Sequence, residues 1–293
     1  MELKIDAKNA LGECILWCDR LQRLLWTDIL GESLWAYQPV SGKIVSWPMP
    51  ERLASFALTD DNDRLLLGLA SQLAYFNFSS GSIAPICQIE ADMPTTRVND
   101  GRCDRQGRFV FGTLNETQDR APIASFYRLN ADLTLQRLEL PHIAIANSIC
   151  FSPDGGTLYY CDSLSKSIRC CSYDAGSGPI TNDRLFADLS KDPGEPDGSA
   201  IDADGYLWNA QWGGWRIVRY TPDGSIDRVI SLPVAQPSCL TFGDPDHASL
   251  YITSARTGLS GPELRKQPHA GGVFYSRLDT VRGLPEQRFM ALS

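Results

Sequence analysis

The sequence predicts an all-β protein folded as a six-bladed β-propeller. Short runs of strand-forming residues, separated by Gly, Asp, Asn and Pro, recur along all 293 residues, while helical periodicity is almost absent. A polar turn followed by large apolar residues occurs six times, at intervals of 41 to 49 residues. A β-rich repeat of that length is typical of a propeller blade, which buries both faces only by stacking on its neighbours. We therefore expect one closed domain over residues 1–293.

The six copies of this pattern mark the second strand of each expected blade. They read CDRLQRLLW, DDNDRLLLG, DRQGRFVFG, SPDGGTLYY, DADGYLWNA and DPDHASLYI, with first large residues at Leu25, Leu66, Phe109, Leu158, Leu207 and Leu250. The outer two strands of five blades follow as hairpins in LWAYQPVSGKIVSW, LAYFNFSSGSIAPI, SFYRLNADLTLQRL, SIRCCSYDAGSGPI and WRIVRYTPDGSIDRVISL. Turn residues separate the arms of these hairpins, and the Asp-Gly pairs at 154–155, 204–205 and 223–224 are expected hairpin turns.

The last blade requires strands from both ends of the chain. It begins near Leu250 and is expected to continue through GGVFYS (271–276) and RFMALS (288–293). The N-terminal segment ELKID (2–6) would supply its outermost strand. Such a closure would remove an exposed sheet edge.

Composition and charge limit the kinds of molecule that this protein is expected to bind. The formal charge of -8 and the absence of clustered Lys and Arg argue against nucleic acid as a partner. No apolar run approaches the roughly 18 residues that span a bilayer, and MELKIDAKNA lacks a signal-peptide core, so we expect a cytoplasmic protein without membrane contact. The nine cysteines contain no CxxC and are expected to be buried free thiols. Because a closed propeller exposes few sheet edges, we expect a monomer.

Candidate metal ligands come from the stretch before each repeated pattern. That stretch is the expected innermost strand of a blade, and its first residue points into the mouth of the ring. The residues that carry oxygen at these positions are Glu13, Asn99, Asn147 and Asp197. Blades two and six offer Ser55 or Phe56 and Ser238 instead, which are poor ligands. Oxygen-bearing side chains from four blades, brought together on one axis, favour a hard divalent cation; the alternative is that Asn and Asp before Gly simply form turns.

Three further residues are candidates for the rim of this site. Arg97 lies two residues before Asn99 and faces the same side of an extended strand, where its guanidinium suits hydroxyl and carbonyl groups. Glu116 follows the third-blade strand and either reaches the rim or is a solvated loop residue. Trp212 could stack on a sugar ring, although packing between blades is the commoner use of an aromatic ring.

Several catalytic motifs are absent from the sequence. It contains no GxSxG, GxGxxG, P-loop or HExxH, and His142, His247 and His269 are scattered. Serine-hydrolase chemistry is therefore disfavoured and metal-centred chemistry is favoured.

The chain resembles the SMP-30/gluconolactonase/regucalcin-like sugar lactonases. The resemblance rests on LGECILW with LLWTDI, RVNDGRCDRQGRFVFGTL, ANSICFSPDGGTLYYCDS, PDGSAIDADGYLWNAQWGGWRIVRYTPDG and SCLTFGDPDHASLYITSAR, and runs through nearly the entire chain. The sequence departs from the family pattern at Cys14-Ile15, in place of Gly-Pro, and at FGD (242–244), in place of FGG.

The resemblance implies a six-bladed propeller that holds one divalent metal, Ca, Zn, Mg, Mn or Fe(II), and opens sugar-acid lactones such as gluconolactone, galactonolactone or arabinonolactone. It implies metal ligation by Glu13, Asn147 and Asp197, and substrate contacts by Arg97, Asn99 and, nearest to the family's acidic residue, Glu116. Asp197 is the expected general base. The alternatives are a non-catalytic calcium- or sugar-binding propeller and, ranked last, a paraoxonase-like esterase, whose histidine pair has no counterpart here.

Overall fold

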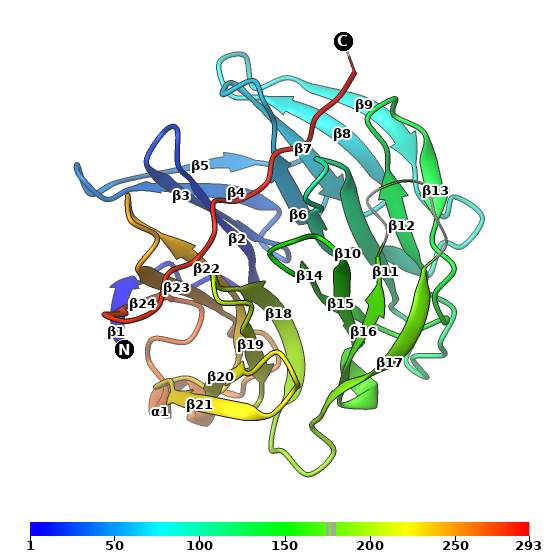
Figure 1. The fold of residues 1–293 in the computed structure, drawn as a ribbon. Coiled ribbons are helices and arrows are strands. Elements are labelled where there is room, and N and C mark those ends of the chain that lie inside the picture. The colour runs from blue at the N-terminus through cyan, green and yellow to red at the C-terminus, as the bar shows by residue number, and fades with distance from the viewer. Residues whose placement is uncertain (174–175, 177–179, 293) are drawn as a thin grey trace.

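The computed structural model, which describes residues 1–173, 176 and 180–292, is a ring of β-sheets around a central axis (Figure 1). Within these residues the strands form six antiparallel four-stranded sheets. The predicted six-bladed β-propeller is confirmed. In each blade the strand nearest the axis is the one that precedes the repeated sequence pattern.

Blades 1 to 3 contain, from the axis outward, β2 (Gly12–Cys18), β3 (Arg23–Asp28), β4 (Ser33–Gln38) and β5 (Lys43–Pro48); β6 (Leu53–Leu58), β7 (Arg64–Leu69), β8 (Gln72–Asn77) and β9 (Ile83–Gln88); and β10 (Thr96–Cys103), β11 (Phe109–Asn115), β12 (Phe126–Leu129) and β13 (Leu135–Arg137).

Blades 4 to 6 contain, in the same order, β14 (Ala146–Phe151), β15 (Thr157–Asp162), β16 (Ser167–Ser172) and β17 (Thr181–Asp188); β18 (Glu195–Ile201), β19 (Leu207–Trp212), β20 (Arg216–Tyr220) and β21 (Ile226–Ser231); and β22 (Pro237–Gly243), β23 (Ser249–Ser254), β24 (Val273–Arg277) and β1 (Glu2–Ile5). The described helices are a short 3-10 turn (Ser163–Ser165) and α1 (Gly261–Lys266).

The hydrophobic core is divided among the seams between blades. Most of the buried apolar residues that the structure describes fall into six clusters, and each cluster joins two adjacent blades. Between blades 1 and 2, for example, Leu25 packs in one cluster with Phe56 and Leu67. Because no blade has a core of its own, each sheet depends on both neighbours for burial.

The N-terminal strand closes the ring as predicted. Strand β1 pairs with β24, with Leu3 opposite Phe274, and Ile5 is buried in the cluster between blades 6 and 1. The segment GGVFYS supplies β24, but RFMALS forms no blade strand among its described residues, 288–292. That part of the expectation was wrong, because the N-terminus already fills the outermost position of blade 6.

The C-terminal segment instead crosses one face of the ring (Figure 1). Gly283 bridges to Asp202 of blade 5, Phe289 bridges to Thr59 of blade 2, and Met290 donates its backbone N–H to Gly107 of blade 3. Phe289 is buried in the cluster between blades 2 and 3. The segment thus links blades that are far apart around the ring.

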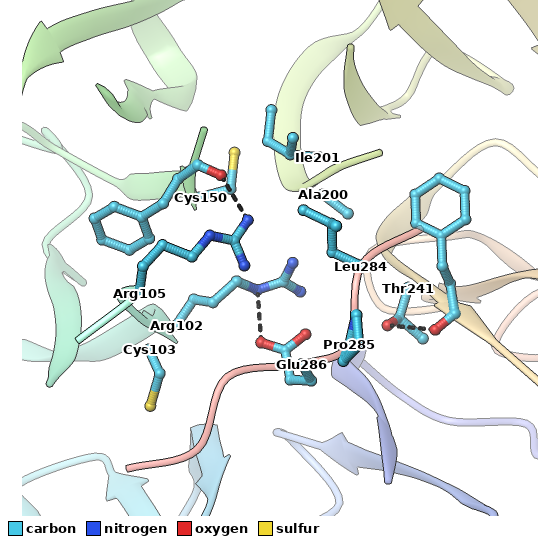
Figure 2. A pocket seen from close by; sticks show the side chains of 12 residues that line it. Arg102, Cys103, Arg105, Cys150, Ala200, Ile201, Thr241, Leu284, Pro285 and Glu286 are labelled. Carbon is cyan, nitrogen blue, oxygen red and sulfur yellow. Dashed lines mark hydrogen bonds and ion pairs between the residues drawn. The ribbon is translucent and has the colours of Figure 1, made fainter. Parts of the chain in front are cut away.

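This segment also covers one end of the central channel. A small cavity of about 30 Å³ lies at the ends of β10, β14, β18 and β22, and residues 284–286 form one wall. Figure 2 shows the guanidinium groups of Arg102 and Arg105 side by side there, with Glu286 facing Arg102 at 3.6 Å between Nε and Oε1. A volume of this size holds about one water molecule.

The predicted Asp-Gly turns have the expected backbone. Gly155, Gly205 and Gly224 have φ values of 76°, 82° and 88°, in the left-handed region that favours glycine. At Gly224 a Cβ atom would lie 2.0 Å from the carbonyl oxygen of Phe186, so a side chain is excluded there. The turn expected within SIRCCSYDAGSGPI falls largely on 174, 175 and 177–179, outside the described residues.

All nine cysteines are free, and all except Cys87 are buried, as predicted. In the described ranges we find no helix with the length and apolar character needed to cross a membrane.

Candidate metal and substrate site

A cavity of roughly 260 Å³ lies at the other end of the channel, where the innermost strands begin. Glu13 of β2, Asn147 of β14 and Asp197 of β18 line it, together with Arg97 and Asn99 of β10. The structure therefore brings five of the six predicted site residues together from four blades. Ser55, Phe56 and Ser238, the alternatives in blades 2 and 6, do not line it.

Each of these four innermost strands contains a β-bulge at the cavity. In β2, Glu13 pairs with Thr27 and Leu16 with Leu25, so Cys14 and Ile15 together lie opposite one residue. Asn147 occupies the same place as Glu13, immediately before its bulge, whereas Asn99 and Asp197 are the first residues inside theirs. The four residues are thus not strictly equivalent in the ladder. Bulges redirect side chains locally, which allows two neighbouring positions to serve one site.

Close packing at the axis accompanies the bulge in β18. A Cβ atom on Gly198 would lie 2.9 Å from Cα of Cys239 in β22. Glycine is therefore required directly after Asp197, since any side chain would push two innermost strands apart.

A chain of hydrogen bonds fixes the amide groups of the site. Arg97 Nη1 donates to Asn99 Oδ1 at 2.8 Å, and Asn99 Nδ2 donates to Asn147 Oδ1 at 3.2 Å. Asn147 Nδ2 then donates to Ser163 Oγ at 2.9 Å, and that hydroxyl donates to the carbonyl oxygen of Pro196 at 2.8 Å. These bonds fix the amide of Asn147 at the cavity, and its oxygen, which accepts one hydrogen bond from Asn99, keeps a second lone pair for a ligand.

The carboxylates of the site repel one another in a dry environment. Burial, followed by the charge of Asp100, raises the pKa of Glu13 from 4.5 to about 8. Burial and the charge of Glu13 raise the pKa of Asp197 well above its ordinary value, and burial also raises the pKa of Asp100. A nearby cation would relieve this cost, because opposite charge favours the ionised form of a carboxyl group.

The donor set suits a divalent cation. Glu13 and Asp197 offer carboxylate oxygens and Asn147 offers an amide oxygen, which are ligands that hard cations prefer. Among the residues that the structure describes, no three His, Cys, Asp or Glu side chains are placed so that they alone could hold a metal ion. A metal here would therefore take Asn147 as its third protein ligand, and the buried, mutually repelling acids fit that requirement.

Glu116, the sixth predicted residue, stands behind Arg97 and not on the cavity wall. Its carboxylate accepts from both ends of the Arg52 guanidinium, at 2.5 and 2.8 Å, and Oε1 lies 3.4 Å from Arg97 Nε. These contacts hold Arg97 against the site. Glu116 is thus placed to position Arg97, and Arg52 holds the Glu116 carboxylate in turn.

Sequence reasoning missed several residues that line the cavity. Glu195, Arg120, Ser163 and Thr257 contribute to its wall, as does Trp212, which was a candidate. Glu195 could have been found, since it lies two residues before Asp197 and therefore faces the same side of β18. Arg120 and Thr257 come from loops, whose course no strand pattern predicts.

The chain is similar in sequence and in fold to known proteins. Residues 11–256 match the family model described as SMP-30/gluconolactonase/LRE-like region. An L-arabinolactonase from Azospirillum brasilense is 52% identical over 94% of this chain and 91% of that protein. A 6-deoxy-6-sulfogluconolactonase from Pseudomonas putida is 34% identical over 96% and 95% of the two chains. The crystal structure of regucalcin from Agrobacterium tumefaciens, described as a calcium-binding protein, superposes with a TM-score of 0.92 at 29% identity, covering 98% and 96%.

Proposed function

Because the chain belongs to the SMP-30/gluconolactonase/LRE-like family, we propose that it is a sugar lactonase, a carboxylic ester hydrolase that opens sugar-acid lactones to aldonates. The observation that carries this proposal is the gathering of Glu13, Asn147, Asp197 and Arg97 around one cavity at the axis. The 52% identity to an L-arabinolactonase supports an arabinonolactone as the preferred substrate.

Glu13, Asn147 and Asp197 would hold one divalent metal ion, and Ca, Zn, Mg, Mn and Fe(II) all suit an oxygen donor set to some degree. The likeness to a calcium-binding regucalcin supports calcium as the first ion to test. When bound, such an ion would supply Lewis-acid polarisation of the lactone carbonyl and would lower the pKa of an adjacent water molecule.

Asp197 is the proposed general base. It lies at the cavity, and its backbone carbonyl accepts hydrogen bonds from Ser148 Oγ at 2.6 Å and from Asn209 Nδ2 at 3.0 Å, so the strand is fixed at this position. Asp197 would accept a proton from the attacking water as the water oxygen bonds to the carbonyl carbon. The ring C–O bond then breaks, and the departing ring oxygen takes the proton from Asp197 to become a hydroxyl of the opened sugar acid. The new carboxylic acid ionises to the aldonate and releases a proton to solvent.

Arg97 and Asn99 orient the substrate in this proposal. Arg97 is buried and is held by the backbone carbonyl of Val98, by Asn99 and by Glu116. Its position beside the carboxylates allows it to donate to hydroxyl groups of the lactone or to the oxyanion that develops in the transition state.

The test is acid release in a pH-stat with arabinonolactone, galactonolactone and gluconolactone, before chelation, after chelation and after reloading with each ion. Metal-dependent acid release is expected, and Asp197→Ala should remove both bound metal and turnover. Asp246→Asn, which alters an exposed ion pair with Arg277, is the matched control and should keep both. Full turnover by metal-free Asp197→Ala would overturn the mechanism, and bound metal without turnover of any lactone would favour a binding protein.

A further inference from the structure

A second groove adjoins the substrate cavity. It has a volume of about 700 Å³ and lies between the β19–β20 turn and the segment that follows β23. Trp212 and Thr257 line both the groove and the cavity, so the two are neighbours across these side chains. A molecule seated in the cavity can therefore extend into the groove past the indole of Trp212.

The aromatic walls of the groove are free of other rings. Of the seven tryptophans, Trp17, Trp26, Trp35, Trp47 and Trp208 each pack against another aromatic ring. Within the described residues Trp212 and Trp215 pack against no other aromatic ring. Trp215 is 43% exposed. Trp212 and Trp215, the two tryptophans beside the groove, thus lack the ring-on-ring packing that the other tryptophans of the propeller have.

Trp215 also has an unusual backbone conformation. Its φ of 59° is in the left-handed region, where a bulky residue is rare and glycine is favoured. Hydrogen bonds hold it there, from Trp215 N to the carbonyl of Ala235 and from Leu232 N to the carbonyl of Trp215. Glu32 and Lys166 have the same conformation at the equivalent turns of blades 1 and 4, so the left-handed turn belongs to the fold. What is particular to blade 5 is the exposed indole that this turn carries beside the groove.

The floor of the groove is polar. Gln236 is 6% exposed and donates from Nε2 to the carbonyl of Thr257 at 3.1 Å. Its Oε1 has no hydrogen-bond partner among the described residues. Glu263 and Lys266 of α1 add charged groups along the edge. Aromatic walls with polar groups at the base suit a ring that carries hydroxyls at its edge and C–H groups on its faces.

We propose that this groove is a second sugar-ring subsite, which accepts the non-reacting ring of a glycosylated lactone, that is, the lactone of an oxidised disaccharide. The lactone ring occupies the cavity beside Asp197, and the attached ring stacks on Trp212 and Trp215. This inference rests on the proposed lactonase function and adds a substrate class to it.

The experiment compares kcat/KM for arabinonolactone with kcat/KM for cellobionolactone and maltobionolactone. The variant is Trp215→Gly, which removes the indole and supplies the residue that suits the backbone there, so folding is preserved. Stacking on one aromatic ring is worth a factor of roughly three to ten, and the disaccharide-to-monosaccharide ratio of kcat/KM should fall by about that factor, through KM. Val229→Ala, an exposed change in β21 of the same blade, should leave the ratio unchanged.

The inference is overturned if the native protein opens arabinonolactone but neither disaccharide lactone, or if Trp215→Gly leaves the ratio unchanged. A failure of the proposed function is distinguishable, since no monosaccharide lactone would then be opened. In that case binding of cellobionate and maltobionate, measured by tryptophan fluorescence, tests the groove alone: binding that Trp215→Gly weakens supports it, and no binding contradicts it.

Discussion

At the scale of single residues, the site is defined by where its charged side chains lie. Glu13 and Asp197 lie together although burial raises the pKa of both; the charge of Asp100 adds to the rise at Glu13, and the charge of Glu13 adds to the rise at Asp197. Beside them Arg97 carries a buried positive charge, and desolvation lowers its pKa to about 10. Glu116 and Arg52 set the position of that charge from outside the cavity.

Replacing Glu116 by Gln should weaken substrate binding. The change keeps the shape of the side chain but removes the charge that faces Arg52 and Arg97, so the Arg97 guanidinium loses an anchor. Since charge-assisted hydrogen bonds are about twice as strong as neutral ones, we expect KM to rise about three- to tenfold while kcat changes less. Steady-state kinetics with arabinonolactone would show this.

Metal content provides the control for this variant. Glu116→Gln should bind metal as the native protein does, because Glu116 touches neither Glu13 nor Asn147. A parallel loss of metal would mean that Glu116 supports the metal ligands and not Arg97.

At the scale of elements, hydrogen-bonded loops deliver the innermost strands to the axis. Asp28, the last residue of β3, accepts from the backbone N–H groups of Ala10 and Leu11 just before β2. Asp162, the last residue of β15, accepts in the same way from Ala144 and Ile145 before β14. Glu13 and Asn147, the two proposed metal ligands nearest these loops, therefore follow equivalent, hydrogen-bonded loop ends.

Strand β1 is the element on which ring closure depends. Deleting residues 1–6 would expose the outer edge of β24 and remove Ile5 from the seam between blades 6 and 1. We expect the midpoint of thermal unfolding to fall by about 5 °C or more, as 2 kcal/mol shifts a protein of this size by several degrees. Glu2→Ala, which keeps the strand pairing, should unfold within about 1 °C of the native protein. An unchanged midpoint after the deletion would show that β1 does not close the ring.

At the scale of the whole molecule, the ring is stabilised from its seams, from the C-terminal segment and from the axis. A metal held by Glu13, Asn147 and Asp197 would tie blades 1, 4 and 5 to one point. Anything that binds the folded state alone stabilises it, so metal removal should lower the stability of the entire ring.

The metal-free protein should also lose stability as the pH rises. The pKa of Glu13 is about 8 in the folded protein against 4.5 ordinarily, so the folded state holds a proton that the unfolded state has released. The stability is complete below pH 4.5 with respect to this group and is lost as the pH rises through about 8. Thermal unfolding of chelated protein between pH 5 and 8 should show the decline, and Glu13→Gln or added metal should reduce it. A midpoint that rises equally over this range in both proteins would contradict the role of Glu13.

The sequence determined the ring. Six spaced turn-and-strand patterns predicted the blades, because a strand's side chains alternate locally and each polar turn is encoded by adjacent residues. The spacing of residues before each repeated pattern also predicted that Glu13, Asn99, Asn147 and Asp197 lie near the axis. It did not predict that bulges place these residues at two different ladder positions, since a bulge depends on how the partner strand pairs.

Only the tertiary structure decided which distant groups meet. The Arg52–Glu116–Arg97 contact, the crossing of the ring by Phe289 and Glu286, and the groove between Trp215 and Gln236 all join loops or ends whose paths follow from packing across blades. Local patterns carry no information on such paths, because a loop has no repeating contact to fix its direction. For that reason the axis of the ring and the residues that gather at it were predictable from the amino-acid order, whereas the loops that complete the cavity wall were not.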